Sequence, residues 1–355
     1  MSDTTIVIAA GGTGGHVFPA LAVATVLQER DIPVVWVGSE SGLENRVVPD
    51  NGIPIRNIGV SPLRGGGLLR KPLGMFNLVK AVISSMKIVR QVQAGTVLGM
   101  GGYVSGPVCL AAKITGCRMV VHEQNAVPGF TNRVLTRFAS KVLEAIPDTF
   151  ASASKATCTG NPVRQELLTI DEPVARYASR SGALRVLVIG GSQGARSLNQ
   201  KVPEALALVE EPLEIIHQCG PRWMQETQEH YRDITHQCEI KEFIEDMAEV
   251  YSWADIIVCR SGAMTVAEIA AVGLASILIP YPAAVDDHQT ANGAFLVDAG
   301  AAVMMQESDL TAAGLAAQLQ NFDRNKLTLM AQSARQVSKR DATERVITEL
   351  TGVAA

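Results

Sequence analysis

The chain contains two glycine-rich segments, and each directly follows a short apolar run. Residues 6–10 (IVIAA) precede residues 11–16 (GGTGGH), and residues 186–189 (VLVI) precede residues 190–195 (GGSQGA). A continuous apolar run is typical of a parallel strand that is buried on both faces. A glycine-rich turn into a helix presents backbone N–H groups and the positive end of the helix dipole, which suits a phosphate. Two such segments, about half a chain apart, predict two α/β halves with a ligand held between them.

The length of 355 residues corresponds to two domains, at about 100–200 residues per domain. No apolar run reaches the ~20 residues of a membrane-spanning helix. The longest apolar stretch, residues 269–285, contains Pro280 and Pro282, which favours a helix end followed by a buried strand. No basic segment precedes the first apolar run, so we expect no signal peptide.

The six cysteines form no C-x-x-C pair, so their spacing indicates neither a zinc site nor a redox motif. Free thiols in a chain for which we expect no export signal favour the reducing cytoplasm. We therefore expect no bound metal.

Basic side chains are concentrated in one part of the chain, although its net charge is −4. Residues 51–122 contain no Asp or Glu. The basic residues in this stretch are Arg56, Arg64, Arg70, Lys71, Lys80, Lys87, Arg90, Lys113 and Arg118. Such a long acid-free stretch is unusual at ordinary charged content and favours an anionic partner at one face. The alternative is a chance run of solvated side chains.

Strands and helices are expected to alternate in both halves. In the first half, strands are expected at 6–10, 34–37, 96–98 and 119–122, and helices at 18–30, 75–92 and 107–115. In the second half, strands are expected at 185–189, 213–218, 254–258 and 276–279, and helices at 197–208 and 265–272. This alternation predicts an α/β fold with parallel sheets and right-handed crossovers. Gly160, Pro162 and Pro173 place the domain boundary near residues 161–173.

Two of the expected helices carry more specific predictions. In the helix at 75–92, an apolar stripe at helical spacing is predicted to face the core. Its members are Met75, Val79, Val82, Met86 and Val89. Residues 341–350 are predicted to form a C-terminal helix with Asp341 as its N-cap and Glu344 at the N3 position.

Three kinds of phosphate-binding loop are compatible with a glycine-rich turn. A nucleoside-triphosphatase loop requires G-x-x-x-x-G-K-[ST], and no lysine follows either loop here. A dinucleotide fold requires G-x-G-x-x-G and an acid that ends the second strand. Val17 occupies the third glycine position, and Glu40 is a poor candidate for the acid. The remaining possibility is a nucleotide-sugar diphosphate held between two domains.

Several motifs, in their order and spacing, resemble the MurG family of peptidoglycan N-acetylglucosaminyltransferases. They lie at 11–19 (GGTGGHVFP), 98–107 (LGMGGYVSGP), 122–125 (HEQN), 160–164 (GNPVR), 190–195 (GGSQGA), 242–244 (EFI) and 259–268 (CRSGAMTVAE). The resemblance spans nearly the whole chain. It implies a GT-B fold, with two Rossmann-like domains facing across a cleft. It also implies transfer of N-acetylglucosamine (GlcNAc) from UDP-GlcNAc to lipid I, giving lipid II, with inversion at the sugar and without an obligatory metal or other cofactor.

The resemblance places the donor mainly in the C-terminal domain. Ile244 would contact uracil through its main chain, Glu268 the ribose hydroxyls, and Ser192 the diphosphate. Asn125 and Gln289 would contact the sugar, and Arg164 near the hinge also takes part in donor binding. The remaining donor-binding positions are Thr13, Gly14, Gly15, Ala263, Met264, Thr265, Val266 and Ala267. The family usually has two adjacent glutamines at the last site, and here His288 replaces the first.

The resemblance implies that the N-terminal loops face the acceptor and its diphosphate. The loop at 13–15 would do so together with Gly101, Gly102 and Tyr103. His16 is the candidate general base, because an imidazole with an ordinary pKa near 6.5 can accept a proton at neutral pH. The alternatives for His16 are acceptor positioning or packing of the loop. Tyr103 and Glu123 are further candidates in the same region, and Glu123 is alternatively a buried structural acid.

Lipid I is carried on a membrane polyprenyl chain, which suggests a use for the acid-free stretch. Apolar side chains among basic ones are typical of proteins that bind an anionic membrane surface peripherally. The predicted membrane patch consists of Arg64, Leu68, Leu69, Arg70, Lys71, Leu73, Phe76 and Lys80. Alternatively, these leucines complete the core of the domain. The expected location is the cytoplasmic face of the bacterial inner membrane, with cell-wall assembly proteins as further partners and no nucleic acid.

The predicted division is an acceptor and membrane-facing domain at 1–163, a UDP-GlcNAc domain at 164–340, and a C-terminal helix at 341–355 that packs back on the first domain. Two other functions stay open: a GT-B transferase with a different sugar nucleotide or acceptor, and an NAD-binding oxidoreductase or sensor. The segment 263–268 suits a UDP ribose, and Val17 disfavours NAD.

Overall fold

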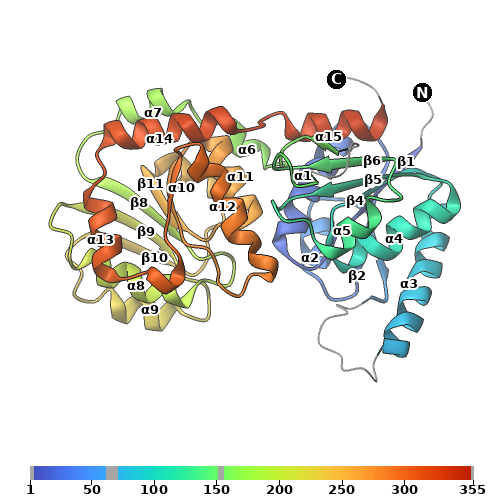
Figure 1. Cartoon of the computed structure of the whole chain (residues 1–355), viewed down its shortest axis with the longest axis horizontal. Helices are drawn as coiled ribbons and strands as arrows, with labels where there is room; N and C mark the ends of the chain where they lie inside the picture. The colour runs from blue at the N-terminus through green and yellow to red at the C-terminus, as the bar shows by residue number, and fades with distance from the viewer. Residues whose placement is uncertain (1–3, 61–70, 151–155, 353–355) are drawn as a thin grey trace. The chain divides into compact units, whose positions relative to one another are not determined.

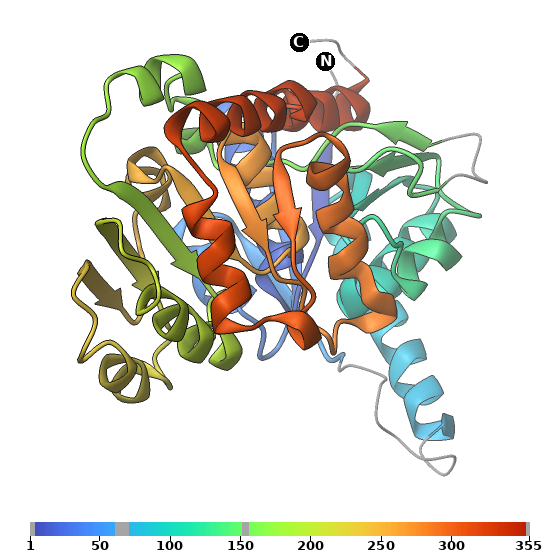
Figure 2. The same cartoon turned by 60° about the vertical axis from the view of Figure 1, so that its left-hand side comes forward.

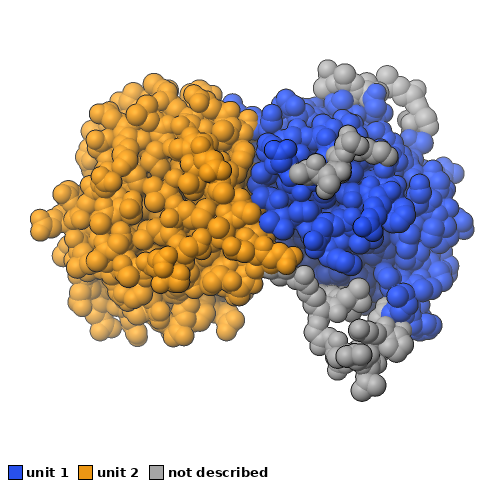
Figure 3. Space-filling model, viewed as in Figure 1, with its two compact units in different colours: residues 1–164, 339–355 blue, residues 165–338 orange. Residues whose placement is uncertain are grey.

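The structure is a computed structural model and describes residues 4–60, 71–150 and 156–352. The chain forms two compact units, shown in Figure 3. Unit 1 comprises residues 1–164 and 339–355, and unit 2 comprises residues 165–338. The division therefore follows Arg164, and the C-terminal segment returns to the first unit.

Unit 1 is built on a seven-stranded sheet whose strands are all parallel (Figure 1). The strands are β1 (Thr5–Ala9), β2 (Val34–Ser39), β3 (Ile55–Ile58), β4 (Ala94–Gly99), β5 (Arg118–Glu123), β6 (Lys141–Glu144) and β7 (Ala156–Cys158). Their order in the sheet is β3-β2-β1-β4-β5-β6-β7. The strand order reverses between β1 and β4. The carboxyl ends of these two strands therefore form the topological switch point, where α/β sheets bind ligands.

Helices cover both faces of this sheet because its strands are apolar on both sides. The helices are α1 (Gly14–Glu29), α2 (Glu44–Asp50), α3 (Lys71–Gln91), α4 (Gly102–Thr115), α5 (Phe130–Leu135) and α15 (Ala342–Thr351). Ile6 and Ile8 of β1 pack in the buried cluster that includes α1 and α15. Val7 and Ala9 pack in the opposite cluster, with α3, α4 and α5. This two-sided burial explains the continuous apolar run in the sequence.

The C-terminal helix α15 packs against α1 and β4 of unit 1. Val346, Ile347 and Leu350 are buried there, and Lys141 Nζ lies 3.0 Å from Glu349 Oε1. Asp341 occupies the N-cap position but caps no backbone N–H, because its carboxylate instead accepts a hydrogen bond from Arg345 Nε. The predicted positions of Asp341 as N-cap and Glu344 as N3 are confirmed, but the Asp341 side chain makes no capping hydrogen bond.

Unit 2 repeats the same plan with a six-stranded parallel sheet. The strands are β8 (Leu184–Ile189), β9 (Leu213–Gln218), β10 (Gln237–Lys241), β11 (Ile256–Cys259), β12 (Ala275–Leu278) and β13 (Ala302–Met304). Their order is β10-β9-β8-β11-β12-β13, so the switch point lies between β8 and β11. The predicted α/β class with two parallel sheets is confirmed.

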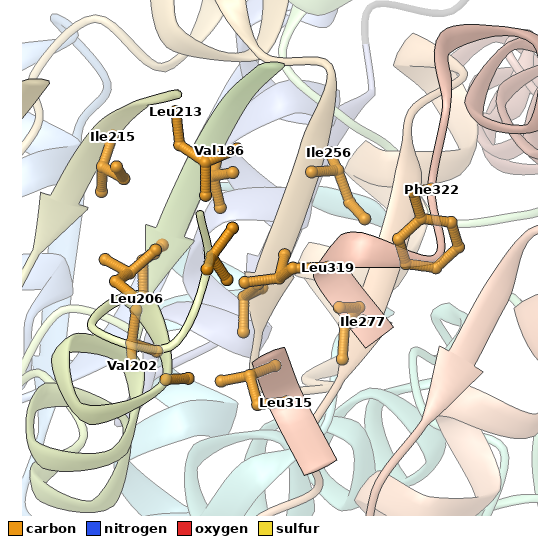
Figure 4. Packing of buried hydrophobic residues seen from close by; sticks show 14 of the residues in the cluster. Val186, Val202, Leu206, Leu213, Ile215, Ile256, Ile277, Leu315, Leu319 and Phe322 are labelled. Atoms are coloured by element: carbon orange, nitrogen blue, oxygen red, sulfur yellow. The ribbon is translucent and has the colours of Figure 1, made fainter. Parts of the chain in front are cut away.

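The α-helices of unit 2 also cover both faces of its sheet. They are α6 (Gln165–Leu168), α7 (Pro173–Ala178), α8 (Arg196–Leu206), α9 (Met224–His230), α10 (Met247–Trp253), α11 (Ala263–Val272), α12 (His288–Asp298), α13 (Ala312–Gln320) and α14 (Arg324–Val337). Figure 2 shows α13 crossing one face of the sheet. On that face Val186, Ile256 and Ile277 of the strands pack with α8, α13 and α14 (Figure 4). Leu187 and Ile189 face the opposite cluster, which includes α10, α11 and α12.

Helices α1, α3 and α4 of unit 1 begin earlier than the sequence predicts, and two of them begin at glycines. Helix α1 begins at Gly14 rather than residue 18, and α4 begins at Gly102 rather than residue 107. Glycines are poor helix formers, so propensity alone places them in loops, but here tertiary contacts continue each helix to the end of the preceding strand. The motif residues Gly14, Gly15 and His16 therefore form the first turn of α1.

The predicted core stripe of α3 is wrong in its first half. Met75 and Val79 are 62% and 49% exposed, whereas Val82 and Val89 are buried. Figure 1 shows the N-terminal end of α3 extending away from the sheet of unit 1. Helical periodicity identifies an apolar face, but it does not show how far a neighbouring element covers that face. Among the described helices, none combines the length and apolarity needed to cross a bilayer.

We predict that Gly194→Ala destabilises unit 2 far more than Gly191→Ala. Both glycines have positive φ, 73° and 88°, which costs a non-glycine residue about 1–2 kcal/mol. A Cβ at Gly194 would lie 1.7 Å from the Cys219 carbonyl oxygen, whereas a Cβ at Gly191 meets nothing within 4 Å. We expect losses of about 1 kcal/mol for Gly191→Ala and about 3 kcal/mol or more for Gly194→Ala, measured by denaturant unfolding. Equal losses would contradict the close packing of the loop.

Candidate active site

The first glycine-rich loop is held by a buried carboxylate, Glu44. Its Oε1 accepts hydrogen bonds from the backbone N–H of Ser39 (2.9 Å) and the Ser39 hydroxyl (2.7 Å). Its Oε2 accepts a bond from the Gly12 N–H at 3.1 Å. Glu44 thus ties the loop after β1 to the end of β2. The N–H of Gly12 is occupied by this contact, and the sequence analysis missed the role of Glu44.

Tyr103, in the first turn of α4, covers the same loop. Its hydroxyl donates to Ser39 Oγ at 3.2 Å, and a Cβ at Gly12 would lie 3.2 Å from its ring. Tyr103 therefore packs over the loop and shares the Ser39 contact with Glu44.

His16 lies in the first turn of α1, beside the loop that leads into α4. A Cβ at Gly101 would lie 3.0 Å from His16 Cε1, and one at Gly102 would lie 3.4 Å from His16 Cδ2. Gly101 and Gly102 also have positive φ, at 88° and 74°. Only glycine allows this backbone to approach the imidazole so closely. The structure therefore brings together the two N-terminal motifs that the sequence analysis assigned to the acceptor.

Helices α1 and α4 both begin at this switch point without a side-chain cap. The N-cap residues are Thr13 and Gly101, and neither provides a capping hydrogen bond. Two helix N-termini therefore direct their positive dipole ends to the carboxyl edge of the sheet, an arrangement that favours an anionic group.

Glu123, at the end of β5, is a structural acceptor. Its Oε1 accepts from the N–H groups of Gln124 (3.1 Å) and Asn125 (3.0 Å) and from Asn125 Nδ2 (3.1 Å). Its Oε2 accepts from the Gly129 N–H (3.1 Å) and from Asn132 Nδ2 (2.8 Å). This buried carboxylate organises the loop after β5 and orients Asn125. These contacts favour the structural interpretation of Glu123 over the catalytic one.

His122 and Gln124 form a buried polar chain that leads to His16. Gln124 Oε1 lies 2.9 Å from His16 Nδ1, and Gln124 Nε2 lies 3.0 Å from His122 Nδ1. His122 Nε2 lies 3.0 Å from the Gly160 carbonyl oxygen. Burial lowers the pKa of His122 to about 4, against the smaller opposing effects of the Gly160 bond and the Glu123 charge. His122 is therefore neutral at physiological pH.

Arg164 is the last residue of the first segment of unit 1. Its guanidinium carbon lies 5.8 Å from the centre of the Phe18 ring, within the range of a cation–π contact. This contact places Arg164 beside α1, the helix that also carries His16.

In unit 2, the segment predicted to hold UDP forms the first turns of α11. The N-cap is Gly262, so no side chain caps the helix. Met264, Thr265 and Ala267 are half-buried, whereas Ala263 and Val266 pack into the core. An uncapped helix start at the carboxyl end of β11 suits a diphosphate.

Glu268 lies one turn further along α11 and is 6% exposed. The buried Tyr251 of α10 donates its hydroxyl to Glu268 Oε2 at 3.1 Å. Ile244, in the loop before α10, packs in the same buried cluster as Tyr251 and Val266. The residues assigned to uracil and ribose therefore lie on elements that share one core. The sequence analysis missed Tyr251, because a lone tyrosine in a helix carries no motif.

Ser192, in the second glycine-rich loop, is exposed. Arg260, which follows β11, contacts α8, the helix that begins after this loop. Arg260 Nη2 donates to Ser197 Oγ of α8 at 2.8 Å and pairs with Glu307. Arg260 Nη1 donates to the carbonyls of Ile279 (3.1 Å) and Pro280 (3.0 Å). Arg260 therefore links the end of β11 to the first turn of α8 and to the segment that follows β12. Its place in a glycine-rich motif suggested no separate role.

Gln289 lies in the first turn of α12, and its Oε1 accepts a bond from the Tyr281 N–H at 2.9 Å. His288 begins this helix. The two residues before it, Asp286 and Asp287, have φ values of 53° and 50°, which non-glycine residues rarely adopt. The chain accepts this strain at the turn that presents residues 288 and 289.

The predicted membrane patch is only partly described. Arg64, Leu68, Leu69 and Arg70 lie outside the described residues, and Lys71 and Leu73 lie in the first turn of α3. Phe76 is 55% exposed, and Lys80 Nζ lies 4.6 Å from the centre of its ring. Phe76 therefore does not complete the core. Within residues 4–60, 71–150 and 156–352, no cluster of His, Cys, Asp and Glu could hold a metal ion.

Comparison with known proteins gives matches over nearly the whole chain. Residues 6–144 match the glycosyltransferase family 28 N-terminal domain, and residues 185–346 match the glycosyltransferase family 28 C-terminal domain. Two curated relatives, from Marinobacter nauticus and Coxiella burnetii, are 47% and 48% identical. The first match covers 95% of this chain and 94% of the relative, and the second covers 97% of each.

Both relatives are named UDP-N-acetylglucosamine–N-acetylmuramyl-(pentapeptide) pyrophosphoryl-undecaprenol N-acetylglucosamine transferase. The crystal structure of MurG from Acinetobacter baumannii is 42% identical, with a TM-score of 0.86. The match covers 99% of this chain and 100% of that one. The predicted GT-B architecture is thereby confirmed, and the chain belongs to glycosyltransferase family 28 and, within it, to the MurG family.

Proposed function

We propose that this protein transfers GlcNAc from UDP-GlcNAc to the C4 hydroxyl of the N-acetylmuramyl residue of lipid I, undecaprenyl-diphospho-MurNAc-pentapeptide. The product is lipid II, and the reaction inverts the anomeric centre. The observation that carries the proposal is the identity of about 47% to transferases of this name over 95% of the chain. The proposed reaction uses its two substrates and no cofactor.

The reaction requires a base for the attacking hydroxyl and stabilisation of the departing diphosphate. In the proposed donor site, the N-terminus of α11 and Ser192 receive the diphosphate. Glu268 accepts hydrogen bonds from the two ribose hydroxyls, and its orientation is supported by Tyr251. The backbone of Ile244 faces uracil, and Gln289 contacts the sugar.

In the proposed acceptor site, the N-termini of α1 and α4 receive the diphosphate of lipid I. His16 is the proposed general base, because it lies between these helix starts, half-buried against Gly101 and Gly102. The NAD alternative is disfavoured by Val17, which is fully buried where a dinucleotide loop needs its third glycine.

We also propose that unit 1 binds an anionic membrane surface through an apolar–basic surface on α3 and α4. Its exposed apolar residues are Met75, Phe76, Val79, Ile83, Leu110 and Ile114, and its exposed basic residues are Lys80, Lys87, Arg90 and Lys113. Helices α3 and α4 pack against each other. On α3, the exposed members fall within an arc of about 140° at 100° per residue, and residues 51–122 contain no acid. This pattern supports peripheral binding.

We predict that the wild-type protein transfers labelled GlcNAc from UDP-GlcNAc to a lipid I analogue. His16→Ala should lower kcat about 100-fold or more, because general base catalysis contributes about 10²–10⁴-fold. UDP affinity, measured by calorimetry, should be unchanged by His16→Ala. Absence of transfer by wild type despite UDP binding would point to a different acceptor. A rise in the thermal unfolding temperature with NADH but not with UDP would contradict the donor assignment.

We predict a graded loss of UDP affinity when the Glu268 contact is altered. Glu268→Gln should raise the Kd for UDP about 10-fold or more, because a hydrogen bond to a charged group contributes about 1.5–3 kcal/mol. Tyr251→Phe should raise it less, since Glu268 stays in place. The control is Tyr231→Phe, which removes another buried tyrosine hydroxyl, 2.8 Å from His217 Nδ1. An equal effect of Tyr231→Phe would show that general loosening of unit 2 explains the result.

We predict that Phe76→Glu combined with Ile83→Glu lowers sedimentation with anionic liposomes about 10-fold or more. The double variant loses two exposed apolar contacts and adds two charges that repel anionic lipid. Leu329→Glu on α14 is the matched control, because Leu329 is 66% exposed but lies in unit 2. Unchanged sedimentation of the double variant would refute the membrane proposal, and the assignment of the donor site would be unaffected.

A further inference from the structure

In the chain of hydrogen bonds from His16 to Gly160, donors and acceptors can be assigned in only one way. It runs through Gln124 and His122, both fully buried, and contains three contacts of 2.9–3.0 Å. A neutral imidazole donates through one ring nitrogen and accepts through the other, and an amide donates through nitrogen and accepts through oxygen. Each link therefore constrains the next.

Backbone carbonyls determine the direction of this chain at two points. A carbonyl oxygen only accepts, so His122 must donate from Nε2 to Gly160, which leaves its Nδ1 as an acceptor. Gln124 Nε2 then donates to His122 Nδ1, and it also lies 3.2 Å from the His122 carbonyl oxygen. Both contacts require the amide nitrogen of Gln124 to face His122. Its oxygen therefore faces His16.

We propose that Gln124 is a positioning residue that holds His16 in the tautomer with the proton on Nδ1. Gln124 Oε1 accepts that proton in a hydrogen bond of 2.9 Å. His16 Nε2 is left with its lone pair, ready to accept the proton of the acceptor hydroxyl. This inference rests on the proposed function of His16 as general base, and it assigns the atom that acts.

The proton balance is simple and requires no transfer along the chain. The acceptor hydroxyl transfers its proton to His16 Nε2 while the hydroxyl oxygen bonds to the anomeric carbon. The bond between the anomeric carbon and the UDP phosphate breaks, and its electrons leave with UDP. The resulting imidazolium still donates from Nδ1 to Gln124 Oε1. His122 keeps its one proton on Nε2, bonded to Gly160. The chain therefore supports His16 in both charge states.

The glycines beside His16 complete this positioning. A Cβ at Gly101 would lie 3.0 Å from the ring, closer than a normal contact, and a Cβ at Gly102 would lie 3.4 Å from it, at the limit of normal contact. The ring is thus packed by α4 and hydrogen-bonded by Gln124.

The first test is spectroscopic and uses the wild-type protein. Two-bond ¹H–¹⁵N spectra of protein labelled with ¹⁵N-histidine distinguish the two tautomers, and His16→Gln assigns the His16 signal among the six histidines. We expect His16 to carry its proton on Nδ1. A proton on Nε2 would overturn the proposal, and this result does not depend on any variant of Gln124.

The second test uses Gln124→Met, which keeps the side-chain length but accepts no comparable hydrogen bond. We expect mixed His16 tautomers and a fall in kcat of about 10–100-fold, with little change in the KM for UDP-GlcNAc. Gln124→Glu keeps an oxygen facing His16 and should retain the Nδ1-protonated tautomer and more of kcat than Gln124→Met. The control is Asn199→Leu, which removes an amide bonded to the buried His217 in unit 2.

The outcomes separate this inference from the function on which it rests. If wild type transfers GlcNAc and Gln124→Met keeps both its kcat and a single His16 tautomer, the positioning role is wrong. If Asn199→Leu lowers kcat as much as Gln124→Met, loss of a buried amide explains the effect and the role is again wrong. If wild type does not transfer GlcNAc, the proposed function fails, whatever the tautomer of His16.

Discussion

The close approach of backbone to backbone at the carboxyl ends of the central strands is the constraint on which both units depend. In unit 1, a Cβ at Gly102 would lie 3.0 Å from the Gly11 carbonyl oxygen. In unit 2, a Cβ at Gly190 would lie 2.3 Å from the Ala195 nitrogen. These contacts let the helices begin directly at the sheet edge, without side-chain caps. The same feature that allows the fold thus creates two sites for anionic groups.

Buried polar side chains stabilise these loops. Glu44 accepts three hydrogen bonds from Gly12 and Ser39. Glu123 accepts four from the loop after β5 and one from Asn132 of α5. In unit 2, Arg260 donates hydrogen bonds to the segment after β12 and to Ser197 of α8. A buried charge is expensive unless it is fully hydrogen-bonded, so each of these groups both orders its loop and depends on it. The proposed functional side chains, His16 and Glu268, are in turn held by neutral partners, Gln124 and Tyr251.

All eight strands predicted from the sequence are present, but β3, β6, β7, β10 and β13 were not predicted, and several helix starts were misplaced. Apolar runs identified β1 and β8, because burial on both faces leaves no polar positions in a strand. Helix starts at glycines were missed, because low helical propensity is overridden there by contacts with neighbouring strands. In α3 the apolar stripe was real, but its first half faces outward. Only the packing of α4 against the later turns of α3 shows where the apolar stripe of α3 ceases to be buried.

Local pattern was enough to establish the α/β class, the two glycine-rich loops and the family motifs, because these depend on residue type and spacing along the chain. The tertiary structure decided which side chains meet. Gly12 and Glu44 are 32 residues apart, and His16 and Gln124 are 108 apart, yet each pair forms a hydrogen bond. No periodicity links such residues, since parallel strands with long crossovers bring distant segments to one sheet edge. The partners of His16 and Glu268 therefore emerge only when the strands are placed in order.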